Sequence, residues 1–160
     1  MLHTATSCIF LAEVQTSGSE LWKTDGTVDG TQLIKKFDYN RLGNAHSLIV
    51  YKDNLYFIAE TIGSGSDVWI SDGTTAGTKV EFKGPVGSVN TYTWGLEINN
   101  EYLYFGSSSP SEGTKVHVTT GNSDILKTLD LSPWLQYSFP QRLMFFGNNM
   151  LFVSDTLKDR

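Results

Sequence analysis

Short runs of alternating hydrophobic and polar residues, separated by turn-forming residues, dominate this chain. The clearest stretch contains four such runs, near residues 46–51, 55–60, 67–71 and 78–82. Tyr, Phe, Val, Ile and Trp fill these runs, and such side chains pack well on a pleated surface. Apolar residues do not recur at three-and-four spacing over the ~10 to 12 residues that a helix needs. The pattern therefore predicts an all-β fold of antiparallel strands joined by short turns.

The same pattern returns after about 47 residues. Residues 8–13 realign on 55–60, and Trp22 realigns on Trp69. The turn residues that follow keep this offset, so that Asp25, Gly26 and Thr27 align with Asp72, Gly73 and Thr74. A fixed offset over separate blocks is the signature of a repeat architecture.

A third and a fourth copy are less regular. In the third, 103–105 aligns with 55–57, but His117 stands at the Trp position and Thr120 at the turn Asp. The fourth copy begins near residue 142, and its Trp and Asp-Gly-Thr positions are not reached. We therefore divide the chain into one repeat array, with a partial unit at 1–42, a complete unit at 43–88, a degenerate unit at 89–134 and a partial unit at 135–160.

A four-stranded antiparallel unit of about 47 residues has the length and strand number of a β-propeller blade. A β-solenoid fits less well, because its coils are usually shorter and pair their strands in parallel between coils. We expect thirteen strands: three in the first unit, which lacks its first strand, four in each of the next two and two in the last. Thirteen strands do not close a ring of four-stranded blades. We therefore expect a segment of a longer array, or a protomer whose partial ends a neighbour completes.

Two stretches carry a motif around the turn. Residues 20–27 read Glu-Leu-Trp-Lys-Thr-Asp-Gly-Thr, and residues 67–74 read Asp-Val-Trp-Ile-Ser-Asp-Gly-Thr. This motif resembles the Glu-Leu-Trp-x-x-Asp-Gly-Thr repeat of large bacterial surface and secreted proteins, although Asp67 and Val68 depart from its first two positions. With the degenerate copies, the resemblance spans nearly the whole chain. It implies β-propeller repeats in an extracellular protein, with no activity that can be transferred residue by residue.

The Asp of this motif has a structural and a functional interpretation. At the start of a turn, Asp25 or Asp72 can accept hydrogen bonds from the backbone two residues on, while Gly supplies a positive φ and Thr a second hydroxyl. Alternatively, Asp25 and Asp29 could bind calcium through hard oxygen ligands. Because Ala76 stands in the second copy where the first has Asp29, we favour structural turns and expect neither a metal nor another cofactor.

The aromatic residues divide into two groups. Trp22 and Trp69 fall in the third strand of their units, where we expect them to pack in the core or between blades. Other aromatic residues fall outside the repeat pattern, in or near predicted connections, where they could stack on a ligand or cover the end of a blade, which we favour. The candidates for ligand stacking are Trp94, Trp134, Tyr92 and Tyr137.

Composition removes several function classes. The net charge is −5 and the charged residues form no basic stripe, so nucleic acid is not an expected partner. No apolar run approaches the ~18 residues that span a bilayer, so membrane insertion is not expected. Cys8 is the single cysteine and cannot form an internal disulfide. The three histidines, His3, His46 and His117, show no zinc-binding spacing, and neither a phosphate loop nor a serine nucleophile elbow occurs.

These observations favour a non-enzymatic extracellular scaffold of a cell-surface or filament-forming protein that mediates assembly or adhesion. Its expected partners are other copies of itself or further repeats of a longer chain. A carbohydrate-binding, lectin-like propeller is the alternative hypothesis, with glycans as partners. A propeller glycoside hydrolase comes third, because it would need carboxylates from different blades to meet around one sugar.

Overall fold

The computed structural model describes residues 2–4, 7–14, 18–37, 45–61, 65–83, 92–131 and 139–155. These residues form 14 strands in four antiparallel sheets. The prediction of an all-β fold built from repeated antiparallel sheets is confirmed. Within the described ranges, no helix is long and apolar enough to cross a membrane.

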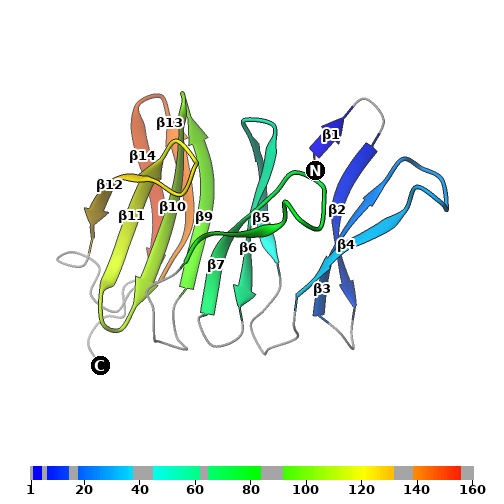
Figure 1. Ribbon diagram of the computed structural model, residues 1–160. Coiled ribbons are helices and arrows are strands. Elements are labelled where there is room, and N and C mark those ends of the chain that lie inside the picture. Colours follow the sequence, from blue (N-terminus) through cyan, green and yellow to red (C-terminus); the bar gives the residue numbers. More distant parts are fainter. Residues whose placement is uncertain are drawn as a thin grey trace.

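Each sheet is a meander in which consecutive strands pair. The first sheet contains β1 (Leu2–Thr4), β2 (Ser7–Val14), β3 (Gly18–Thr24) and β4 (Gln32–Lys36). The second contains β5 (His46–Tyr51), β6 (Asn54–Thr61), β7 (Gly65–Ser71) and β8 (Lys79–Phe82). The third contains β9 (Tyr92–Asn99), β10 (Tyr102–Ser109), β11 (Gly113–Thr119) and β12 (Ile125–Asp130), and the fourth contains β13 (Phe139–Phe146) and β14 (Asn149–Asp155). The sheets follow one another in chain order, from the blue first sheet to the orange fourth (Figure 1).

The expected number of strands was wrong in the first unit. We expected this unit to lack its first strand, but β1 pairs antiparallel with β2, with Leu2 opposite Ile9 and Thr4 opposite Ser7. Since β1 has only three residues, it is too short to show the alternation that identifies a strand. The first sheet therefore has four strands, and the described residues form 14 strands instead of the expected 13.

The second sheet shows why the strands begin and end where they do. Its strands β5 to β8 lie within two residues of the four runs that the hydrophobic pattern predicts. Between β5 and β6, Lys52 and Asp53 both have a positive φ, of 48° and 59°. A two-residue turn with this geometry matches the right-handed twist of the strands it joins. The turn thereby fixes the register, in which Tyr51 lies opposite Asn54.

Each sheet has two faces, because successive side chains of a strand point in opposite directions. We call the face that carries Leu55 and Phe57 in the second sheet face A, and the opposite face, which carries Tyr56 and Ile58, face B. Aligned positions of the other sheets fall on the same faces. These two names describe how the sheets pack.

Face B of each sheet packs against face A of the next. Between the first two sheets, Ile9 and Leu21 of face B form one cluster with face A residues such as Phe57 and Trp69. Between the second and third sheets, the face B residues Tyr56, Ile58 and Val68 form a cluster with Leu103 and Phe105 of face A. Between the third and fourth sheets, Trp94 and Val116 of face B meet Leu143 and Phe152 of face A.

An aromatic contact marks each of these interfaces. Phe37 lies 5.5 Å from Phe57, centroid to centroid, at the first interface. Phe82 lies 5.1 Å from Phe105 at the second, and Tyr104 lies 4.6 Å from Phe145 at the third. Burying one such large apolar side chain stabilises the fold by about 1.5 to 3 kcal/mol. The sheets therefore depend on their neighbours for most of their apolar burial.

Candidate functional site

The first Asp-Gly-Thr turn is closed by side-chain hydrogen bonds. The backbone N–H of Thr27 and its hydroxyl both donate to Asp25 Oδ1, at 2.9 and 2.7 Å. Gly30 N–H donates to the Thr27 hydroxyl at 2.9 Å, and the Thr31 hydroxyl donates to the Thr27 carbonyl at 2.6 Å. Gly26 has a φ of 94°, which a glycine adopts at little cost.

The second turn reproduces this network bond for bond. Thr74 donates twice to Asp72 Oδ1, at 2.9 and 2.7 Å. Gly77 N–H donates to the Thr74 hydroxyl at 2.9 Å, and the Thr78 hydroxyl donates to the Thr74 carbonyl at 2.6 Å. Gly73 has a φ of 89°. Each of the predicted turn residues thus takes part in a local hydrogen-bonded loop.

These bonds also favour the ionised form of both aspartates. The Thr27 hydroxyl and then its backbone N–H hold the pKa of Asp25 below its usual value. Thr74 lowers the pKa of Asp72 in the same way. Hydrogen bonds to the ionised carboxylate favour the ionised form. Within the described residues, no group of three or more His, Cys, Asp and Glu side chains could hold a metal ion.

The second glycine of each turn has a role that the sequence analysis did not assign. A Cβ on Gly30 would lie 1.9 Å from Asp25 Oδ1, and one on Gly77 would lie 2.1 Å from Asp72 Cγ. Both distances are far below van der Waals contact, so the carboxylate occupies the place of a side chain. The repeated Gly-Thr at these positions was the available signal, but only the folded turn shows what requires it.

The tryptophans of the repeat lie on face A. Trp69 is buried at the first interface, 5.2 Å from Phe37, and the Lys35 ammonium lies 5.0 Å from its ring centre. Trp22 is half-buried on β3, and its Nε1 donates to Glu20 at 3.0 Å. Glu20 also forms an ion pair with Lys36, at 2.8 Å. Trp69 thus packs between sheets, as expected, whereas Trp22 lies on the outer face of the first sheet.

Of the proposed ligand-stacking aromatics, the structure describes Trp94 and Tyr92. Trp94 lies on β9 instead of in a connection, and its side chain is only 6% exposed. A Cβ on Gly106 would lie 2.0 Å from the Trp94 ring, so the indole fills the place of a side chain on β10. Tyr92 begins β9 and is half-buried. Trp134 and Tyr137 lie outside the described residues.

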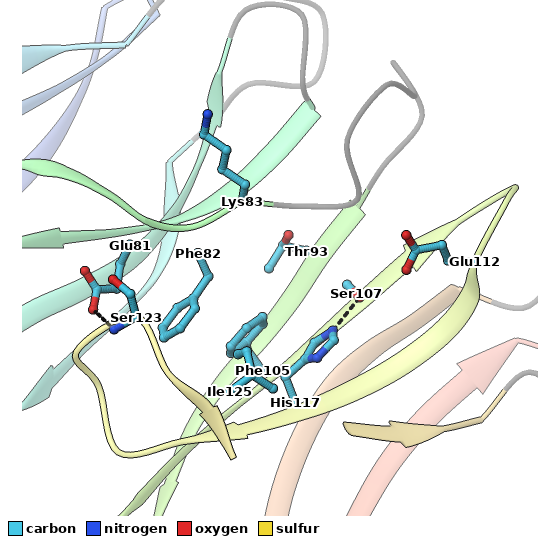
Figure 2. Close-up of a pocket in the computed structure, with 10 residues that line it drawn as sticks. All are labelled: Glu81, Phe82, Lys83, Thr93, Phe105, Ser107, Glu112, His117, Ser123 and Ile125. Carbon is cyan, nitrogen blue, oxygen red and sulfur yellow. Dashed lines mark hydrogen bonds between the residues drawn. The ribbon is translucent and has the colours of Figure 1, made fainter. Parts of the chain in front are cut away.

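A pocket opens between the second and third sheets, and neither Trp94 nor Tyr92 lines it. Its volume is about 410 Å³. Figure 2 shows Phe82 and Phe105 at its centre, with Ser107 and His117 beside them. No repeat or motif in the sequence indicates this pocket, although the change from Trp to His at position 117 is a visible signal of it.

Hydrogen bonds hold the polar groups of the pocket. Ser107 Oγ lies 2.8 Å from His117 Nε2, and Thr128 Oγ1 lies 3.1 Å from His117 Nδ1. Burial of the imidazole and, to a smaller extent, the charge of Lys115 lower the pKa of His117, and Glu112 partly opposes this shift. The ring is therefore mainly neutral at neutral pH.

Two carboxylates line opposite ends of the pocket (Figure 2). Glu81 accepts a hydrogen bond from the backbone N–H of Ser123 at 2.6 Å. Glu112 forms an ion pair with Lys115 at 2.7 Å. Each carboxylate thus has a partner within the chain, and we assign no catalytic role to this pair. The glycoside-hydrolase hypothesis stays a prediction.

Comparisons of the chain with family models, curated proteins and solved structures found no match.

Proposed function

We propose that this chain is a non-enzymatic scaffold module, in which sheets of one repeat stack face to face and continue that stacking into an assembly. The observation that carries this proposal is the uncovered face B of the fourth sheet. Its apolar side chains are largely exposed: Met144 by 44%, Phe146 by 78%, Leu151 by 48% and Val153 by 58%. Contiguous exposed apolar residues on a soluble protein commonly mark an interaction surface.

The equivalent positions of the other sheets are covered. Leu151 aligns with Ile9 in the first sheet and with Tyr56 in the second. Ile9 and Tyr56 are each only 3% exposed. In both cases a face A from the following sheet provides the cover. The surface that fits the fourth sheet's face B is therefore another face A of the same repeat.

The first sheet presents such a face A. Phe10, Trp22 and Leu33 lie side by side across β2, β3 and β4. In the second sheet the matching row is Phe57, Trp69 and Val80, which packs in the first interface. In the first sheet the row is only half covered, and Leu33 is 37% exposed.

The two ends of the stack thus carry complementary faces. The occupant that we propose for face B of the fourth sheet is face A of the first sheet in a second copy of this chain. Such a contact uses two different surfaces, so it produces a ring if it closes and a filament if it does not. The same argument holds for further repeats of a longer chain, which would present the same face.

We further propose that the sheets are propeller-like blades. In support, β9 contacts both β5 and β13, which are the first strands of the neighbouring sheets. First strands that lie next to one another are expected around a propeller axis.

The extracellular or cell-surface location is proposed from the resemblance of residues 20–27 and 67–74 to the repeats of secreted bacterial proteins.

Sedimentation of the purified chain over a range of concentrations tests the scaffold proposal. We expect the sedimentation coefficient to rise with concentration, and Val153→Asp to weaken the association at least tenfold. Val28, which is 91% exposed in the first turn, provides the matched control, and Val28→Asp should associate like the natural chain. A compact monomer at every concentration, with no binding to further copies of the repeat, would overturn the proposal.

A further inference from the structure

The pocket between the second and third sheets occurs where the repeat is degenerate. In the second sheet, the side chain of Trp69 covers the equivalent position of face A and contacts Phe37 and Phe57. The aligned residue of the third sheet is His117, and Ser107 replaces Ala59 beside it. An imidazole is much smaller than an indole. The third sheet therefore leaves open a space that its neighbour fills with its own side chain.

The walls of the opened space combine apolar rings with hydroxyl groups. Phe82 and Phe105 contact each other at 5.1 Å and are each about 95% buried, and the His117 ring lies 4.9 Å from Phe105. Ser107, which is 3% exposed, adds a hydroxyl at the depth of the pocket. Thr93, which is 5% exposed, also lines the pocket, and its hydroxyl donates to the Ser66 carbonyl. Apolar walls with a few converging polar groups are typical of small-molecule sites.

The polar groups suit a neutral ligand better than a charged one. Both nitrogens of the neutral His117 ring are already bonded, to Ser107 and Thr128. A serine hydroxyl can donate one hydrogen bond and accept two, so Ser107 can bond a neutral ligand in addition to His117. The negative charge of Glu112 is paired with Lys115, and both Lys83 and Glu81 line the pocket. Charges of both signs at the rim leave no strong field of one sign to attract an ion.

We propose that this pocket binds a small neutral sugar, with a hydroxyl of the sugar bonded to Ser107 Oγ and the apolar face of the sugar against the phenylalanine rings. The volume of about 410 Å³ lies in the range of about 300 to 1,000 Å³ that is usual for such ligands. This site is separate from the two uncovered end faces, on the first and fourth sheets, that carry the proposed assembly. Loss of sugar binding and loss of assembly are therefore distinguishable results. The pocket also differs from a site at Trp94, whose ring is buried in the next interface.

The repeat itself supplies the variant that tests this proposal. His117→Trp restores the residue of the two regular copies and should fill the pocket. We would titrate glucose, galactose, mannose and N-acetylglucosamine into the ¹⁵N-labelled chain and follow its NMR spectrum. We expect at least one sugar to shift the signals of His117, Ser107 and their neighbours, and His117→Trp to weaken this binding at least tenfold. His46→Trp, the same change at an exposed position of β5, should leave binding unchanged.

Several results would overturn the proposal. One is that none of the four sugars shifts a signal of the pocket, and another is that the shifts map to a different surface. A third is that inorganic phosphate or free lysine binds in the pocket while no neutral sugar does. If His117→Trp does not fold, Ser107→Ala provides the second variant, because it removes the hydroxyl and adds no atoms to this buried position. Unchanged sugar affinity in Ser107→Ala would then contradict the proposed hydrogen bonding.

Discussion

At the scale of single residues, the turns show how far sequence reasoning extends. The pattern Asp-Gly-Thr predicts a turn because Asp can accept hydrogen bonds from the backbone, Gly adopts a positive φ and Thr supplies a hydroxyl. In both turns the backbone N–H of Thr donates to the Asp carboxylate, as this pattern predicts. The need for Gly30 and Gly77 could not be predicted, since it arises from where the aspartate side chain lies after folding. The burial of Trp94 was equally hidden, because it depends on a register shift opposite Gly106.

The crowding between Asp72 and Gly77 leads to a prediction of coupled stability. Asp72→Ala should lower the free energy of unfolding by about 1 kcal/mol through its lost hydrogen bonds. Gly77→Ala alone should cost about 2 kcal/mol, because its methyl group would overlap the carboxylate. In the double variant the overlap is gone, so the combined cost should be clearly smaller than the two single costs added. Urea unfolding of the four proteins measures this difference, and strictly additive costs would show that the crowding is unimportant.

The same carboxylate predicts a dependence of stability on acid. The folded-state pKa of Asp72 lies below its usual 3.8, because Thr74 donates to the ionised form. The resulting stabilisation is complete above the unfolded-state pKa and is lost as the pH falls through the folded-state value. Between about pH 5 and 2, the free energy of unfolding should therefore fall more steeply for the natural chain than for Asp72→Asn. Equal slopes in urea titrations across this range would contradict the role given to Thr74.

At the scale of strands and sheets, the regular repeat was the more predictable part. All four strands of the second sheet were located from alternation and turn residues, because that unit keeps every signal of the motif. The first strand of the first sheet was missed because three residues carry no period. The pocket was missed because it results from packing between two sheets, and a pattern read along one strand gives no information about what faces it.

The degenerate third sheet should be less protected than the second. Every residue of its outer strand β12 is exposed, whereas β8, the corresponding strand of the second sheet, ends on the buried Phe82. Amide groups of β12 should therefore exchange with solvent faster than those of β8, since local opening there exposes less apolar surface. Hydrogen exchange followed by NMR measures both strands in one sample. Stronger protection in β12 than in β8 would show that degeneracy has not weakened this sheet.

At the scale of the whole molecule, stability and assembly have the same physical origin. Every interface between sheets in this chain is a face B against a face A. An isolated sheet cannot bury both of its faces, so the stack ends in uncovered apolar residues wherever no further sheet follows. The proposed contact between copies is therefore a fourth instance of an interface that the chain already makes three times.

Mixing two variants tests the proposed contact between copies. Leu33→Asp places a charge on face A of the first sheet, and Val153→Asp places one on face B of the fourth. Each variant alone should sediment as a monomer, because each lacks one of the two complementary faces. Mixed in equal amounts, the intact face B of the first variant should bind the intact face A of the second and give a dimer but no larger species. Continued association of either variant alone, or a mixture that stays monomeric while the natural chain associates, would contradict the account.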